Sequence, residues 1–117
     1  MKILLVDDEE KFVSRLAQRL ILRGLEADWA TTWDEALSKT EKGKYDIAVL
    51  DVKMPFMSGI DLKKKLEKIS PDMKFIFVTG HGSEEDYNVG SKEAAFYIMK
   101  PFKIETLVEK IKQALEV

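Results

Sequence analysis

The sequence predicts an α/β domain in which helices cover both faces of a five-stranded parallel sheet, a doubly wound arrangement. Short apolar runs alternate along the chain with segments whose apolar residues recur at helical spacing. Most of these runs show no polar alternation, which is typical of parallel strands buried on both faces. The chain has 117 residues, and this length suits a single domain over residues 1–117.

The first strand is expected at Ile3–Val6, an apolar run that ends at four acidic residues, Asp7–Glu10. In the segment Phe12–Leu20 the apolar side chains fall on one face of a helix. Gly24 fits the C-terminal stop of that helix. Leu25–Ala30 then alternates apolar and polar side chains over most of its length, which suggests an edge strand.

A second helix is expected to begin at Thr32, because Thr32–Glu35 matches a capping box. Gly43 is expected to end it. The next apolar run, Ile47–Leu50, again ends at an acidic residue, Asp51.

A third helix is expected at Gly59–Ile69, where Ser70-Pro71 provides the stop. The remaining strands are expected at Phe75–Val78 and Phe96–Met99, and a last helix at Ile104–Leu115 carries one apolar stripe. The side chains expected to face inward from the third helix are those of Ile60, Leu62, Leu66 and Ile69.

The composition excludes several classes of protein. The formal net charge is -2, so the chain has no basic excess to hold a nucleic acid. It has no cysteine, which rules out disulfides and thiolate metal sites. No apolar run approaches the ~20 residues that a membrane span needs. We therefore expect a cytoplasmic protein that binds neither nucleic acid nor membrane through these residues.

Reactive side chains follow four of the expected strands. Asp7 and Asp8 follow the first, Asp51 the third, Thr79 the fourth and Lys100 the fifth. The carboxyl ends of parallel strands lie at one edge of a sheet. Three carboxylates, a hydroxyl and an ammonium group are therefore expected to converge on one crevice.

This set of groups suits phosphoryl transfer to a carboxylate. Carboxylates packed together repel one another, and a divalent cation with a preference for oxygen ligands, such as Mg²⁺, relieves that repulsion. A carboxylate can act as a nucleophile and form an acyl phosphate. The metal, the ammonium and the hydroxyl would then each bind an oxygen of the transferred group.

Over essentially its whole length the chain resembles the receiver domains of bacterial two-component response regulators. The resemblance implies a flavodoxin-like sheet with strand order 2-1-3-4-5, and a signalling phosphoacceptor rather than an enzyme. The motifs that carry it are Asp7-Asp8, Asp51 with Met54-Pro55 and Gly59, Val78-Thr79-Gly80 and Lys100-Pro101-Phe102.

The resemblance also implies a role for each site residue. Asp51 accepts a phosphoryl group from a histidine kinase. The side chains of Asp7, Asp8 and Asp51, with the backbone carbonyl of Lys53, bind Mg²⁺. Lys100 contacts the phosphoryl group.

Two further residues match the family's switch, and Pro101 matches one of its prolines. Thr79 moves to bond the phosphoryl group, and Tyr97 then rotates inward. Pro101 matches a proline that usually follows a cis bond, which would aim Lys100 into the site. The face formed by the fourth helix, the fifth strand and the last helix is the signalling face, and it gives a phosphorylation-dependent dimer in part of the family.

The resemblance also places Lys53 and His81 at the rim of the pocket, where residues of the family tune the lifetime of the phosphoryl group. The chain departs from the family between Thr79 and Lys100, a segment one residue shorter than the common pattern. Glu93-Ala94 stands where a Gly-Ala pair is usual, and the fourth helix contains Asn88 and Gly90. A short or irregular fourth helix is expected, since glycine costs about 1 kcal/mol there relative to alanine.

Each of these residues also has a simpler interpretation. Asp7–Glu10 suits a helix N-terminus, and Asp51 could cap a turn. Threonine, as at Thr79, is common in strands, and Tyr97 could be a core aromatic. Lys63–Lys65 is expected to be a solvated helix face.

Three other functions compete with a phosphorylated receiver. A phosphorylation-independent interaction module would usually lack part of the acidic set. A haloacid dehalogenase-like phosphatase needs a second aspartate two residues after the nucleophile, where this chain has Lys53. A flavin-binding protein would need a phosphate-binding loop after the first strand, where Asp7–Glu10 would repel phosphate. Whether the chain stands alone or regulates an attached domain is left open, as are its kinase and its output.

Overall fold

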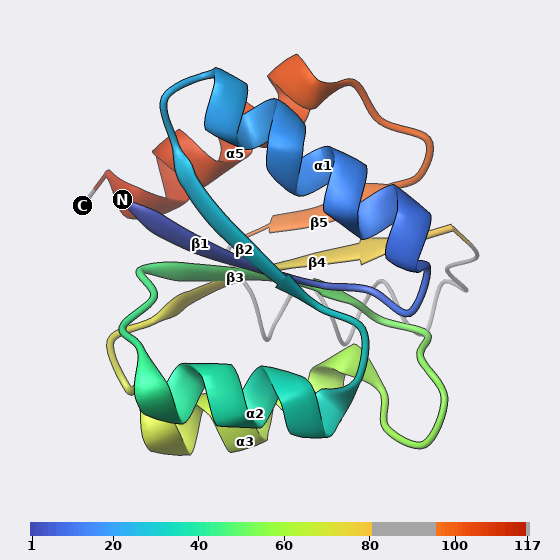
Figure 1. The fold of residues 1–117 in the computed structure, drawn as a ribbon, viewed down its shortest axis with the longest axis vertical. Coiled ribbons are helices and arrows are strands. Elements are labelled where there is room, and N and C mark those ends of the chain that lie inside the picture. Colours follow the sequence, from blue (N-terminus) through green and yellow to red (C-terminus); the bar gives the residue numbers. More distant parts are fainter. Residues whose placement is uncertain (81–95, 117) are drawn as a thin grey trace.

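A computed structural model describes residues 1–80 and 96–116. Its centre is a parallel five-stranded sheet with the order β2-β1-β3-β4-β5, as predicted (Figure 1). The predicted edge strand is β2. Asp7 and Asp8 follow β1, and Asp51 is the last residue of β3. The strands are β1 (Lys2–Val6), β2 (Glu26–Ala30), β3 (Ile47–Asp51), β4 (Lys74–Thr79) and β5 (Phe96–Met99).

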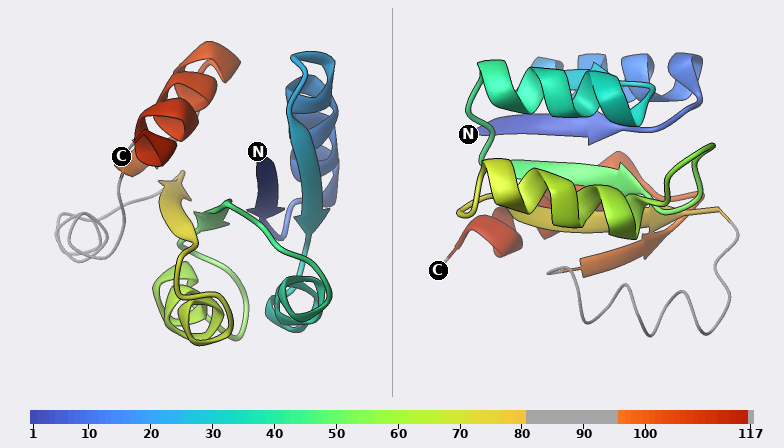
Figure 2. Two further views of the ribbon diagram at one scale, coloured as in Figure 1. Left: turned by 90° about the vertical axis from the view of Figure 1, so that its left-hand side faces the viewer. Right: turned by 90° about the horizontal axis from the view of Figure 1, so that it is seen from below.

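Helices cover both faces of the sheet (Figure 2). α1 (Glu10–Leu22) and α5 (Ile104–Leu115) lie on one face, and α2 (Trp33–Lys42) and α3 (Gly59–Ile69) lie on the other. The expected fourth helix, with Asn88, Gly90 and Glu93-Ala94, lies outside the described residues. Within the described part of the chain, no helix is long and apolar enough to cross a membrane.

The side chains of each central strand divide between two cores. In β1, Ile3 and Leu5 pack toward α1 and α5, whereas Leu4 and Val6 pack toward α2 and α3. β1, β3 and β4 are buried on both faces, as their uninterrupted apolar runs predicted. β5 is less buried, and Met99 is exposed, because this strand pairs with β4 alone in the described sheet. The pairing of β1 with β3 places their carboxyl ends side by side, between the two cores.

The helix ends follow the predicted local signals. Thr32 Oγ1 accepts a hydrogen bond from the Glu35 amide at 3.3 Å, and Glu35 Oε1 accepts one from the Thr31 amide at 2.9 Å. This is a capping box in which the Glu35 carboxylate bonds the amide of Thr31 instead of the amide of the N-cap residue, Thr32. Gly24, after α1, has a φ of +84°, a conformation that favours glycine. Gly43 ends α2 in an extended conformation.

We expect Thr32→Ala to destabilise the domain by about 1 kcal/mol, because it leaves an amide of the first turn of α2 without its side-chain acceptor. Chemical denaturation of both proteins measures this loss. Thr31→Ala is the matched control, since Thr31 contributes its main-chain N–H, and not its side chain, to the bond with Glu35. Equal losses in the two variants would contradict the capping role of Thr32.

Two predictions for α3 were wrong. Lys63 is not a solvated residue: only 9% of it is exposed, its Nζ atom lies 5.7 Å from the centre of the Phe75 ring, and it pairs with Glu67 at 3.0 Å. A lysine stem can cover apolar surface while its ammonium reaches a charged partner. Ile69, expected to face inward, is 36% exposed at the last turn of the helix.

Candidate functional site

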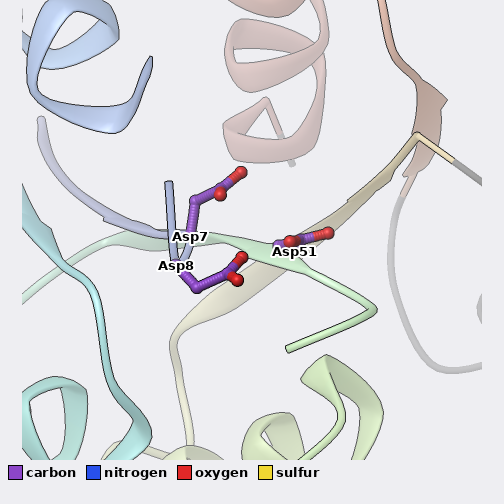
Figure 3. Close-up of side chains that lie close together, drawn as sticks. All are labelled: Asp7, Asp8 and Asp51. Carbon is purple, nitrogen blue, oxygen red and sulfur yellow. The ribbon is translucent and has the colours of Figure 1, made fainter. Parts of the chain in front are cut away.

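The carboxyl ends of β1 and β3 bring three carboxylates together, as predicted. Val6 pairs with Leu50 in the sheet, so the next residues, Asp7 and Asp51, lie side by side. With Asp8 they form a cluster whose carboxylate oxygens, one from each residue, all lie within 4.8 Å of one another (Figure 3). Asp7 and Asp51 are buried and Asp8 is exposed. The cluster is therefore open on the side of Asp8.

The backbone fixes the Asp7 side chain. The Asp7 amide donates to the Ala30 carbonyl at 3.1 Å, which joins the end of β1 to the end of β2. Asp7 Oδ1 accepts a hydrogen bond from the Glu9 amide at 2.9 Å, just before α1 begins. Asp7 thus stabilises the turn into the helix and still directs Oδ2 into the cluster. Asp7 therefore contacts the start of α1, as its helix-start interpretation expected, and its role as a metal ligand stays a prediction.

Lys100 reaches the cluster from the end of β5. Its Nζ atom lies 2.6 Å from Asp7 Oδ2 and 3.7 Å from Glu9 Oε1. The Lys100 amide donates to the Thr79 carbonyl at 2.7 Å, and the bond to Pro101 is cis, as expected. Burial alone would lower the pKa of Lys100, but the hydrogen bond and the charge of Asp7 raise it. Lys100 is therefore a cation here.

The Asp51 carboxyl has a pKa raised to about 7. Burial is the largest cause and repulsion by Asp7 follows, while Lys100 and a backbone hydrogen bond with Lys53 act in the opposite direction. Such a carboxylate needs a further positive charge to stay ionised. Clustered carboxylate oxygens are the ligands that hard divalent cations prefer. The three aspartates thus fit a divalent metal.

Gly59 fixes the position of Asp51. No reason for a glycine at this position was apparent from the sequence. A Cβ atom built on Gly59 would lie 2.3 Å from the Asp51 carbonyl oxygen and 3.0 Å from Val52 Cα. The Gly59 amide donates to the Val52 carbonyl at 2.9 Å. The first turn of α3 therefore packs directly on the backbone that carries Asp51, and only glycine fits there.

The two expected switch residues lie on β4 and β5. Thr79 ends β4, is fully buried, and pairs with Met99 in the sheet. Tyr97 packs edge-on against Phe77, with ring centres 6.5 Å apart, and its hydroxyl oxygen is buried. The tyrosine thus occupies an inward position in this structure, and its rotation stays a prediction.

Phe12 belongs to the site although its spacing predicted only a core position. Its ring centre lies 4.4 Å from Lys100 Nζ, and Phe102 packs edge-on against the ring at 6.2 Å. Glu9, 3.7 Å from the same ammonium, was also missed. The chain separation between α1 and the end of β5 hides such contacts from any local pattern.

Of the two expected rim residues, Lys53 is exposed in the loop after β3. His81 lies outside the described residues. The use of the Lys53 carbonyl as a metal ligand stays a prediction. The loop continues to Phe56, which is 98% exposed and has a φ of +70°, a conformation that bulky side chains rarely adopt.

Comparison with known proteins identifies the family of the chain. Residues 3–112 match the response regulator receiver domain family. The chain is 37% identical over 117 residues to the sensor kinase CckA of Brucella abortus, a match that covers 97% of this chain and 12% of that protein. It spans about half the length, 50–51%, of several transcriptional regulators that it also matches.

Solved structures of proteins with similar sequences have the same fold. A CheY-like receiver domain from Methanospirillum hungatei superposes with a TM-score of 0.91 at 39% identity, covering 98% of this chain and 93% of that one. The response regulator TrrA of Thermotoga maritima, solved in complex with Mg²⁺ and BeF, gives a TM-score of 0.85 at 36% identity, covering 97% and 98%. The chain therefore belongs to the response regulator receiver domains of two-component systems.

Proposed function

We propose that this domain is a cytoplasmic phosphoacceptor that receives a phosphoryl group on Asp51 from a histidine kinase in an Mg²⁺-dependent reaction. The observation that carries the proposal is the cluster of Asp7, Asp8 and Asp51, whose ligand oxygens lie within 4.8 Å of one another, with Lys100 bonded to Asp7. The TrrA complex with Mg²⁺ and BeF supports it by relationship.

In the forward reaction an Asp51 carboxylate oxygen attacks the phosphorus of a phosphohistidine. A P–O bond to Asp51 forms as the P–N bond breaks, and the bonding electrons return to the imidazole nitrogen of the kinase. Asp51 must be ionised to attack, and its raised pKa opposes this. Mg²⁺, held by Asp7, Asp8, Asp51 and the Lys53 carbonyl, would supply the charge that keeps all three carboxylates ionised.

Lys100 and Thr79 bind the transferred group in this proposal. The Lys100 ammonium leaves Asp7 to donate to one phosphoryl oxygen, and the Thr79 hydroxyl donates to another. The phosphoryl group adds a charge of about -1.5 to -2, which these two donors stabilise. The movement of Thr79 changes the surroundings of the Tyr97 ring, which already faces inward in this structure. β5 and α5 then present a changed surface to an output partner, an attached domain or a second copy.

Hydrolysis resets the domain. Water attacks the phosphorus of the acyl phosphate, the P–O bond to Asp51 breaks, and inorganic phosphate leaves. The chain thus catalyses only its own phosphorylation and dephosphorylation, and it acts as a signalling module rather than as an enzyme with a separate substrate. Lys53, which is exposed after β3, and His81, which follows Gly80 in the sequence, are proposed to set the rate of this reset.

Acetyl phosphate tests the phosphoacceptor function without a kinase. Intact mass spectrometry is expected to show a gain of one phosphoryl group in the wild type with Mg²⁺, and far less when a chelator replaces the metal. The gain should disappear in Asp51→Asn, because an amide is a poor nucleophile and forms no acyl phosphate.

Asp72→Asn is the matched control, since Asp72 lies in the loop before β4, away from the cluster. It should be phosphorylated like the wild type. A wild type that gains no mass under these conditions would instead favour a receiver fold that binds its partners without phosphorylation.

A further inference from the structure

We propose that Phe12 is a positioning residue for Lys100, holding its ammonium at the phosphorylation site through the face of the aromatic ring. The inference rests on the proposed function, because it concerns the residue that would bind the phosphoryl group. It adds a residue from α1 to a site otherwise built at the ends of β1, β3, β4 and β5.

The ammonium of Lys100 lies between carboxylates and a ring. Its Nζ atom is 2.6 Å from Asp7 Oδ2, 3.7 Å from Glu9 Oε1 and 4.4 Å from the Phe12 ring centre. A cation within about 6 Å of a ring centre is attracted by the negative face of the ring. The Phe12 ring is therefore a further contact of the ammonium, in addition to the two carboxylates.

The surroundings strengthen this attraction and fix the ring. Only 17% of the Lys100 side chain is exposed, and cation–π attraction grows when the cation loses water. Phe102 meets the Phe12 ring at an interplanar angle of 83°. Both rings line a small, mainly apolar cavity of about 10 Å³ whose lining also includes Asp7 and Asp51. The ring thus forms one wall of a cavity that reaches the cluster.

The contact of Lys100 with Phe12 confines the ammonium during phosphoryl transfer. Lysine has a long flexible side chain, and confining it costs rotamer entropy. When Lys100 gives up Asp7 to bind a phosphoryl oxygen, it loses its shortest contact. The Phe12 face remains as a contact that does not compete for the phosphoryl group, so the ammonium turns toward Asp51 instead of moving into solvent.

A purely structural role for Phe12 makes a different prediction. The ring also packs against the core between α1 and α5, so its removal could act through folding alone. Phe12→Leu keeps an apolar side chain of similar bulk but removes the aromatic face. Phe12→Tyr keeps the face. If Phe12 has only a structural role, Phe12→Leu and Phe12→Tyr should not differ in their effect on Lys100 once their stabilities are matched.

The first measurement is NMR of the Lys100 side chain in the unphosphorylated domain. Ring currents should shift the Lys100 Hε protons upfield in the wild type and in Phe12→Tyr, and the shift should vanish in Phe12→Leu. The wild-type spectrum tests the contact without any variant, and it needs no activity. Lys100 Hε protons at ordinary lysine shifts in the wild type would overturn the proposal.

The second measurement is the rate of phosphorylation by acetyl phosphate with Mg²⁺. For Phe12→Leu we expect the saturating rate to fall about 3- to 10-fold, as the loss of a partly desolvated cation–π contact implies. The half-saturating concentration should stay close to the wild-type value, and Phe12→Tyr should react at nearly the wild-type rate. Phe96→Leu is the matched control, because it removes the contact of Lys110 with Phe96 at 4.8 Å and should leave the rate unchanged.

A double-mutant cycle separates positioning of Lys100 from any other effect of Phe12. In a Lys100→Met background, Phe12→Leu should cause no further loss of rate. An equal loss in both backgrounds would overturn the proposal. A wild type that is not phosphorylated at all would overturn the proposed function instead, while the Lys100 shift would still report on the contact.

Discussion

Without a divalent metal, Asp51→Asn is expected to make the domain about 2–4 kcal/mol more stable than the wild type at about pH 8. Burial and the charge of Asp7 raise the pKa of Asp51 to about 7, whereas the unfolded chain has a value of about 3.9. Asparagine has nearly the same shape as the protonated acid and carries no charge. The substitution therefore removes a buried, repelled carboxylate and leaves the rest of the site in place.

The pH dependence follows from the direction of the shift. Between about pH 4 and about pH 7 the folded wild type holds the Asp51 proton and the unfolded chain does not, so stability falls as pH rises through this window and levels off above it. The advantage of Asp51→Asn should shrink as pH falls and disappear below about pH 4. Urea unfolding at several pH values measures both curves.

Added Mg²⁺ should reverse the order of stability. A ligand that binds only the folded state stabilises it, and the wild type offers three carboxylates where the variant offers two. Asp72→Asn is the control and should follow the wild type at every pH and metal concentration. If Asp51→Asn proved no more stable than the wild type in chelator at about pH 8, burial and the charge of Asp7 would not raise the pKa of Asp51.

The framework of the site could be predicted because it depends on chain order alone. Uninterrupted apolar runs predict parallel strands, and parallel strands bring Asp7, Asp51, Thr79 and Lys100 to one edge whatever the detailed packing. The bounds of α3 matched the prediction at both ends, because Ser58 caps it and Ser70-Pro71 stops it. Local chemistry and sheet topology were sufficient for these features.

The contacts between elements could not be predicted in this way. Lys63 was expected to be solvated like its neighbours Lys64 and Lys65, and the sequence does not show that its ammonium lies near the Phe75 ring of β4. The helical stripe of α1 placed Phe12 on the inner face but did not reveal that this face meets Lys100. Phe56 is a clearer case, since no sequence rule predicts an exposed phenylalanine at a φ of +70°.

Gly59→Ala is expected to lower both the stability of the domain and the rate of phosphorylation. The new methyl group would lie 2.3 Å from the Asp51 carbonyl oxygen and 2.9 Å from the Asp51 carbonyl carbon. These are backbone atoms, held by the pairing of Asp51 with Val78 in the sheet, so they cannot move aside as a flexible side chain would. Either α3 or the end of β3 must shift.

The expected loss of stability is about 1–3 kcal/mol or more, the usual cost of overpacking a filled interior. The expected loss of rate is about 100-fold, because a shift of about 1 Å in a reacting group has that effect. Urea unfolding and acetyl phosphate kinetics measure the two losses on the same preparation. Kinetics at a temperature where the variant is fully folded keeps the loss of rate separate from unfolding.

Gly43→Ala is the matched control. A methyl group on Gly43 would meet its nearest neighbours, Lys2 Nζ and the Lys39 carbonyl oxygen, at 3.4 and 3.5 Å, which is ordinary contact. Its stability should stay within about 0.5 kcal/mol of the wild type, with an unchanged rate. If Gly59→Ala behaved like Gly43→Ala, the close approach of α3 to Asp51 would not fix the nucleophile. If it lost stability alone, Gly59 would serve the fold, and the position of Asp51 would depend on the carboxylate cluster instead.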